Sequence, residues 1–183
     1  MKKPLIYSIV VLVVVSGCSF FNMITPQETV DSNSPVITAS DEQDSASRFS
    51  QIKGSECIPD LSAVEIAQVK RVIDGDSIEI IMNGEVYQVR YIGINTPEYY
   101  SEEREEAIKA TQANQKLVEG KTIYLFKDQS NTDKYDRLLR YVLTDEVFVN
   151  RELVREGYAE AREYRPDTAC HAVFEAVKYN LYR

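Results

Sequence analysis

The feature that most constrains the fold is an Asn-Gly step between two strand-like segments. Residues 77–82 are rich in β-branched side chains, Asn83-Gly84 follows, and residues 85–94 alternate between two faces. Asn-Gly is the strongest short hairpin signal, because both residues tolerate the positive φ angles of a two-residue turn. This stretch therefore predicts a β-hairpin and, with it, an antiparallel sheet.

The remaining segments extend the hairpin to five strands and three helices. Strands are expected at 64–73, 77–82, 85–94, 121–126 and 138–143. Ser101 is expected to cap a helix that ends at Gly120, Asn150 a short helix that ends at Gly157, and a last helix is expected at about 168–181. One helix after the third strand favours a small closed barrel over an open sheet. The predicted fold class is α+β and mainly β.

The N-terminus predicts export. Lys2 and Lys3 precede a mostly apolar run at 5–15, which is too short for a comfortable membrane span. The string V-S-G-C, which ends at Cys18, resembles the lipobox of bacterial lipoproteins. We expect residues 1–18 to be a lipoprotein signal peptide and Cys18 to carry acyl chains such as palmitate. A plain cleaved signal and an uncleaved anchor are the alternatives.

Export places the rest of the chain in the bacterial cell envelope, facing outside the cytoplasm at the cell membrane or outer membrane, or shed from it. Residues 19–56 are polar and lack apolar periodicity, which predicts a disordered tether, and 57–183 is the expected folded domain. Cys57 and Cys170 flank that domain. In an oxidising compartment they are expected to form a disulfide, the alternative being two unpaired thiols.

The charge balance argues against broad electrostatic binding to nucleic acid. The formal net charge is -8, and the expected domain holds 17 basic against 23 acidic residues. Proteins that bind nucleic acid through charge usually show a basic surface. Any nucleic-acid function must therefore depend on a local basic cluster and on a metal.

Three local groups of polar residues carry the candidate chemistry. Each has an ordinary explanation when taken alone: an Asp-Gly turn, a proline turn and a charged loop. The groups are Asp74-Gly75-Asp76, then Arg90 with Asn95-Thr96-Pro97-Glu98, and finally 132–137 with Arg137 at the start of a strand.

Together the three groups supply what phosphodiester hydrolysis requires. A metal ion polarises a phosphoryl oxygen, and a carboxylate orients or deprotonates the attacking water. Guanidinium groups bind phosphate through a planar fork and stabilise charge in the transition state.

At this point the sequence resembles the staphylococcal nuclease-like (thermonuclease) family. The strings VIDGDSIEI, VRYIGINTPE, TDKYDRLLRYV and VNRELVREGYA are similar to that family's motifs in order and spacing. The resemblance covers about residues 64–166. It implies a five-stranded OB-fold barrel and calcium-dependent endonucleolytic cleavage of DNA and RNA.

The resemblance also implies roles for single residues. Arg90 and Arg137 would hold the scissile phosphate, and Glu98 would act on the attacking water. Calcium would be bound by Asp76, Asn95 and the Thr96 carbonyl, with Asp74 behind them. Lys134 and Tyr135 would touch a neighbouring phosphate, and Tyr164 would offer a base-stacking face.

Two positions depart from the family pattern. Asn95 stands where the family has a metal-binding Asp, which removes one negative charge, so calcium affinity should fall. Asp136 replaces the usual Gly before Arg137 and brings a carboxylate near the phosphate site. His171 lies outside all motifs and is expected to be structural.

Three functions remain open on the sequence alone. The first is an active nuclease, a monomer whose partners are DNA, RNA and, through its lipid anchor, a membrane. The second is a catalytically weak or inactive OB-fold module that binds nucleic acid. The third is a structural envelope lipoprotein. The trio Arg90, Glu98 and Arg137 favours the nuclease, because binding alone does not require it.

Overall fold

The structure, a computed structural model, describes residues 46–178. The expected signal peptide, Cys18 and most of the expected tether lie outside these residues. Within the described part of the chain, none of the helices combines the length and the apolar character that crossing a membrane requires.

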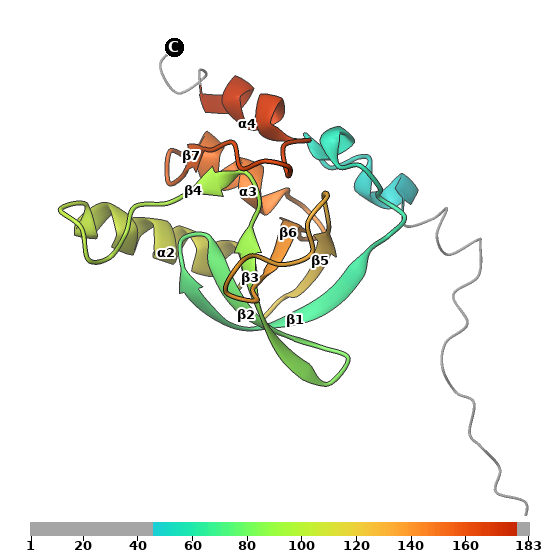
Figure 1. Cartoon of the computed structure of the whole chain (residues 1–183), viewed down its shortest axis with the longest axis horizontal. Helices are drawn as coiled ribbons and strands as arrows, with labels where there is room; N and C mark the ends of the chain where they lie inside the picture. Colours follow the sequence, from blue (N-terminus) through green and yellow to red (C-terminus); the bar gives the residue numbers. More distant parts are fainter. Residues whose placement is uncertain (1–45, 179–183) are drawn as a thin grey trace, which may run out of the picture. The chain divides into compact units, whose positions relative to one another are not determined.

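Five strands form a closed barrel in the order β1-β2-β3-β6-β5 (Figure 1). β3 and β6 run parallel, and the other neighbouring strands are antiparallel. This confirms the predicted mainly β barrel with a helix after the third strand. The strands are β1 (Glu65–Asp74), β2 (Ser77–Met82), β3 (Glu85–Tyr91), β5 (Thr122–Phe126) and β6 (Leu138–Leu143).

The predicted hairpin joins β2 and β3. Asn83 has a φ of 53° and Gly84 a φ of 81°, as a tight turn with two left-handed residues requires. This turn sets the register, which places Ser77 opposite Arg90. The turn chemistry thus brings Arg90 beside the residue that follows Asp76, at the far end of the hairpin.

The helix after the third barrel strand is α2 (Arg104–Val118). Its buried residues lie at helical spacing and include Ala107, Ala110 and Val118. The helix begins later than predicted, because Ser101 forms a turn: its hydroxyl donates to the Glu98 carbonyl at 2.7 Å and accepts the Glu103 N–H at 3.1 Å. Ser101 therefore shapes the segment before α2 and does not cap it.

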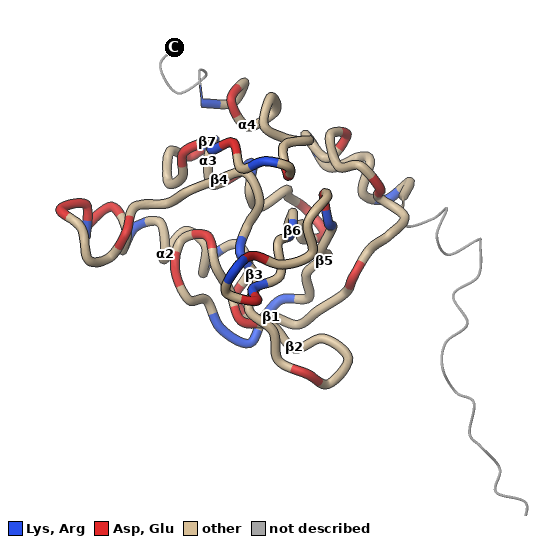
Figure 2. The backbone as a smooth tube through the Cα atoms, viewed as in Figure 1, with Lys and Arg blue, Asp and Glu red and all other residues tan. Residues whose placement is uncertain are grey.

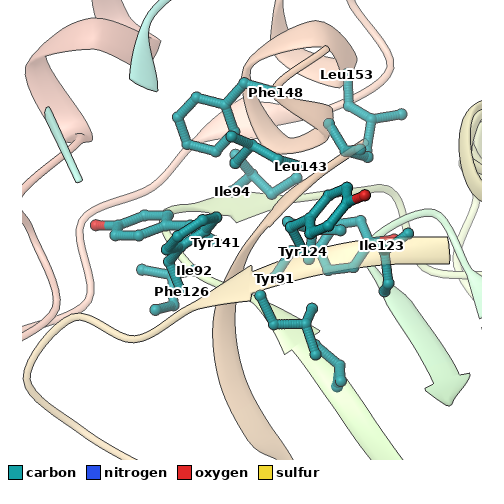
Figure 3. Close-up of a cluster of buried hydrophobic side chains, with 14 of the residues drawn as sticks. Tyr91, Ile92, Ile94, Ile123, Tyr124, Phe126, Tyr141, Leu143, Phe148 and Leu153 are labelled. Carbon is teal, nitrogen blue, oxygen red and sulfur yellow. The ribbon is translucent and has the colours of Figure 1, made fainter. Parts of the chain in front are cut away.

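The barrel interior and the buried side chains of the segments that follow β6 form one hydrophobic core. Figure 3 shows aromatic and aliphatic side chains from β3, β5, β6 and the segment after β6 in mutual contact. Burial of this apolar surface is the main contribution to stability, at about 25 cal/mol per Å². The labelled members are Tyr91, Ile92, Ile94, Ile123, Tyr124, Phe126, Tyr141, Leu143, Phe148 and Leu153.

The folded region begins earlier than the predicted boundary at Cys57. Phe49 is 1% exposed and Ile52 8% exposed, and the Phe49 ring packs against Phe126 and Tyr124. Residues 46–56 are therefore part of the folded region and not of a tether, with Phe49 and Ile52 in the core. Cys57, at the end of the short helix η1 (Ser55–Cys57), forms a disulfide with Cys170, with a Cα–Cα distance of 5.0 Å.

The C-terminal elements cover one end of the barrel. They are α3 (Val149–Arg155), β7 (Glu160–Ala161) and α4 (His171–Lys178), and β7 pairs with the short strand β4 (Ile94–Asn95), which follows β3. Asn150 lies inside α3 and is fully buried, so the prediction that it caps the helix is wrong. Its side chain instead accepts the Val142 N–H and donates to the Ile92 carbonyl, both at 2.9 Å.

Candidate active site

One cleft on the barrel surface, with a volume of about 690 Å³, collects nearly all the residues predicted to act. We call it the main cleft. Thr96 instead lines an adjacent hollow, which shares Asp74, Asp76 and Glu98 with the main cleft. The predicted residues that line the main cleft are Asp74, Asp76, Arg90, Asn95, Glu98, Lys134, Tyr135, Arg137 and Tyr164.

Asp76 is the buried centre of the site, and its side chain is 8% exposed. One carboxylate oxygen accepts the Thr96 N–H at 2.8 Å and the Thr96 hydroxyl at 3.0 Å. The other lies 3.2 Å from Arg90 Nε. Burial and the charge of Asp74 raise the pKa of the Asp76 carboxyl, while Arg90 and Thr96 oppose that rise.

The turn that holds Asp76 depends on two residues that sequence reasoning did not assign to the site. A Cβ on Gly75 would come within 2.8 Å of Ala110 and 2.7 Å of Thr96, so only glycine fits between the helix and the next turn. Asn114 of α2 donates to the Asp74 carbonyl at 2.9 Å. An Asn on the buried face of a helix was the available signal, because a buried amide needs partners.

Arg90 is held by three neighbours. Besides Asp76, its guanidinium donates to the Tyr91 carbonyl at 2.7 Å and to Asn95 Oδ1 at 3.2 Å. The side chain is only 12% exposed. Arg90 therefore stands in a fixed position at the wall of the main cleft, as a phosphate-binding guanidinium requires.

Arg137 is held by a single carboxylate at the loop that enters β6. Asp133 Oδ2 accepts from Arg137 Nε at 2.8 Å and from Nη2 at 2.7 Å, and Asp133 Oδ1 accepts the backbone N–H groups of Tyr135 and Arg137. Although burial alone would raise the pKa of Asp133, these hydrogen bonds lower it overall. Sequence reasoning also did not assign this role to Asp133.

Asp136 adopts a φ of 61°, the left-handed region that glycine enters most readily. A Gly, which the resemblance led us to expect here, enters this region without strain, and Asp is one of the few other residues that tolerate it. Asp136 is exposed and does not line the main cleft. Its carboxylate is therefore not part of the wall of the main cleft.

The outer wall of the main cleft is aromatic and basic. The Tyr135 ring lies 4.9 Å from Lys134 Nζ and 5.6 Å from the guanidinium carbon of Arg137. Tyr164 reaches the site from the loop after β7, and its hydroxyl lies 3.3 Å from Asn95 Oδ1. His171 begins α4 and does not line the main cleft.

The donor set near Asp76 fits a hard cation. Asp76 offers a carboxylate, Asn95 an amide oxygen and Thr96 a backbone carbonyl, the mixture of oxygen ligands that calcium accepts. Among residues 46–178 there is no group of three or more His, Cys, Asp and Glu side chains placed to hold a metal. A cation here would therefore depend on neutral oxygen atoms as well as on carboxylates.

Comparisons with known proteins agree with this geometry. Residues 88–179 match the family described as Staphylococcal nuclease homologue, a range that includes Arg90, Glu98 and Arg137. The thermonuclease of Staphylococcus hyicus is 35% identical over 109 residues, which cover 55% of this chain and 61% of that protein. The thermonuclease of Staphylococcus intermedius is 38% identical over 111 residues, or 58% and 66% of the two chains.

A bacillary relative is similar to the same extent. Endonuclease YncB of Bacillus subtilis is 38% identical over 109 residues, which are 54% of this chain and 49% of that protein. The chain thus spans between about half and two thirds of the length of these relatives. The family match covers half of this chain, and the structure has the closed five-stranded barrel that the resemblance implied. The chain therefore belongs to the staphylococcal nuclease homologue family.

Proposed function

We propose that the protein is a calcium-dependent endonuclease that hydrolyses phosphodiester bonds of DNA and RNA. The observation that carries the proposal is that two arginines and one exposed carboxylate line the main cleft, with an oxygen donor set in that cleft and in the adjoining hollow. Arg90, Glu98 and Arg137 come from three separate segments, and a surface that only binds nucleic acid would not need all three.

Each residue has a defined task in this proposal. Arg90 and Arg137 bind the oxygens of the scissile phosphate and stabilise its growing charge in the transition state. Glu98 is exposed and lines the main cleft, where its carboxylate accepts a proton from the attacking water. Lys134 and Tyr135 bind the phosphate of a neighbouring nucleotide.

Calcium would be held by Asp76, Asn95 and the Thr96 carbonyl. When bound, it supplies positive charge that polarises a phosphoryl oxygen and the water. Asn95 contributes no charge, so we expect weak binding, in the range of about 10⁻⁴–10⁻³ M that extracellular calcium modules show. The Asp76 carboxylate would exchange some of its present hydrogen bonds for the cation.

Binding without cleavage is the second candidate, and one contact favours it. In the structure Arg137 already forms two charge-assisted hydrogen bonds with Asp133, so a phosphate must compete for that guanidinium. If Asp133 keeps Arg137 away from the phosphate, the cleft binds nucleic acid but stabilises the transition state poorly.

The location is part of the proposal. The V-S-G-C string supports lipid attachment at Cys18, which would hold a monomeric protein at the bacterial cell envelope outside the cytoplasm. Incorporation of labelled palmitate by the chain, and its loss in Cys18→Ser, tests this attachment. Labelling that persists in the variant would contradict it.

Digestion of single-stranded DNA, duplex DNA and RNA by the full chain tests the nuclease. A fragment that begins at Cys57 would lose the buried Phe49, so it is unsuitable. We expect cleavage in millimolar calcium, none with a chelator, and a loss of about 10²–10⁴-fold in Glu98→Gln, because the variant lacks the general base but keeps the shape of the side chain.

The outcomes separate the candidates. Calcium-dependent cleavage that Glu98→Gln abolishes supports the nuclease. Binding of the same substrates without cleavage, by a folded chain, would favour the binding module. Wild-type rates in Glu98→Gln would show that this residue is not the base.

A further inference from the structure

A second hollow continues from the main cleft on the side of α2. We call it the side groove; its volume is about 590 Å³. Both hollows are lined by Asp74, Asp76 and Glu98, so the proposed reacting centre lies where they meet. Consider a nucleic-acid strand whose scissile phosphate lies at this centre. If the nucleotide on one side of that phosphate contacts Lys134 and Tyr135, the nucleotide on the other side lies at the side groove.

Two adjacent tyrosines line the side groove directly after Glu98. Tyr100 is 97% exposed and Tyr99 44% exposed, and their ring centroids lie 5.3 Å apart in an edge-on arrangement. Side chains this exposed contribute little burial to the fold. Flat aromatic surface left in water beside a nucleic-acid cleft is what nucleobases stack on.

Contacts within the chain hold the Tyr99 ring, and the backbone on both sides of the tyrosine pair, before any ligand binds. The guanidinium carbon of Arg104 lies 4.6 Å from the Tyr99 ring centroid, and Arg104 also donates to the Tyr99 hydroxyl. The Ser101 N–H and hydroxyl both donate to the Glu98 carbonyl, at 3.1 and 2.7 Å. A preformed surface loses little conformational entropy on binding.

The charged side chains that line the side groove are all carboxylates, Asp74, Asp76 and Glu98, which favours a neutral base there over a phosphate. Figure 2 shows acidic residues gathered in the turn that leads into α2, where Glu102 and Glu103 follow the tyrosine pair. Carboxylates repel phosphate, whereas a neutral base carries no charge to repel. Gln112 and Gln115 of α2 also line the groove and offer amide groups to the edge of a base.

We propose that Tyr99 and Tyr100 form a stacking platform for an unpaired base of the substrate. The base belongs to the nucleotide on the far side of the scissile phosphate from Lys134 and Tyr135. A base paired inside a duplex has no free face, so the platform takes only a base that is unpaired. This inference rests on the proposed function and adds a base-binding site to it.

Binding of a labelled single-stranded oligonucleotide, followed by fluorescence anisotropy, tests the platform. The full chain carries Glu98→Gln to prevent cleavage, and calcium is present. Adding Tyr99→Ala and Tyr100→Ala should raise the Kd about 5- to 100-fold, the range that base stacking on an aromatic residue provides. Tyr100→Phe should bind like its parent, and Val86→Ala, near the start of β3, outside both hollows and 51% exposed, is the matched control.

An abasic nucleotide, moved one position at a time along the oligonucleotide, locates the stacked base. At one position it should weaken binding by the parent as much as the double tyrosine change does, and it should weaken binding by the tyrosine variant no further. Duplex DNA should bind the parent and the tyrosine variant within about twofold.

These results are separable from those of the nuclease test. Cleavage by the wild-type chain together with equal Kd values for the parent and the tyrosine variant overturns the platform and leaves the nuclease. Tyrosine-dependent binding without cleavage by the wild type supports the platform and leaves only a binding function. An oligonucleotide that is neither bound nor cut overturns both.

Discussion

The two arginines of the main cleft are proposed to share one task, but the structure holds them in different ways. Arg90 projects from a barrel strand, is 12% exposed and contacts Asp76, Asn95 and a backbone carbonyl. Arg137 lies at the end of a loop, is 28% exposed and contacts the single carboxylate of Asp133.

This difference shows that the site has a rigid half and an adjustable half. On the Arg90 side, position follows from the barrel register and from buried hydrogen bonds. On the Arg137 side, one loop residue sets both the backbone and the guanidinium. Loops that carry functional residues on a fixed scaffold are common, and their cost is a weaker hold on those residues.

The largest expected effect is a loss of activity, and it should be similar when the arginine of either half is removed. Arg90→Ala and Arg137→Ala should each lower kcat/KM for DNA by about 10²–10³-fold, since each removes a donor to the transition state. Steady-state kinetics in millimolar calcium checks this. Loss in only one of the two variants would show that a single arginine does the work.

Removing the arginine of each half should affect the stability of the protein to different extents. Arg90→Ala leaves the buried Asp76 carboxylate without its cation, which should lower the free energy of unfolding by about 2–3 kcal/mol. Arg137→Ala should lower it by about 1 kcal/mol or less, because this pair is more exposed. Urea unfolding of both variants measures the difference.

A companion variant tests the reason for this separation. Adding Asp76→Asn to Arg90→Ala removes the stranded charge and should restore part of the lost stability. If the double variant loses as much free energy of unfolding as the two single variants lose together, the ion pair does not cause the instability of Arg90→Ala.

A change at Asn95 tests the proposed calcium ligands of the rigid half. Asn95→Asp adds a negative charge to the proposed calcium ligands and should tighten calcium binding about tenfold, because ligand charge sets affinity in such sites. Isothermal titration of the full chain with calcium measures this, and Asn131→Asp, on a loop outside the ligand set, serves as the control. An unchanged titration would remove Asn95 from the calcium ligands.

The adjustable half depends on Asp133, whose contribution to the stability of the protein should change with pH. The pKa of Asp133 lies below its ordinary value of 3.8, so its contribution to stability is present above that pH and is lost as pH falls through the lowered pKa. Asp133→Asn should therefore lower stability by about 1 kcal/mol at pH 7, with the difference shrinking below pH 3.8. Urea unfolding of Asp133→Asn and of the unchanged protein, at pH 7 and again below pH 3.8, measures this. A stability difference between the two proteins that is equal at both pH values would contradict the prediction.

The smallest effect is expected at Asp136. Asp136→Gly removes the backbone preference against a φ of 61° and should change stability by only a few tenths of a kcal/mol, with KM within about twofold. Asp136→Asn, which keeps the tolerance for this conformation, separates charge from backbone. A large fall in KM in both variants would show that the carboxylate does repel the substrate.

Much of the fold was predictable because its signals are local. The Asn83-Gly84 turn, the alternation along β3 and the spacing of Ala107, Ala110 and Val118 each report on a few neighbouring residues. The start of the folded region was not predictable in this way. Phe49 and Ile52 are isolated apolar residues in a polar stretch, and only their contact with the distant β5 shows that they belong to the core.

The site shows the same division. The motifs placed Arg90, Glu98 and Arg137 in the order that the main cleft requires. They gave no sign that Asn114 supports the Asp74–Asp76 turn, that Asn150 bridges two backbone segments, or that Asp133 holds Arg137. A polar residue looks alike in sequence whether water or a buried backbone group is its partner.

The sequence by itself determined the strands, the hairpin register and the residues capable of phosphodiester chemistry, because turn conformation and side-chain alternation depend on adjacent residues. The tertiary structure decided where the folded region begins, which groups hold each arginine, and that Tyr99 and Tyr100 stand exposed beside the reacting centre. These depend on closure of the barrel, which brings together residues far apart in the chain, and no local pattern encodes which of them will meet.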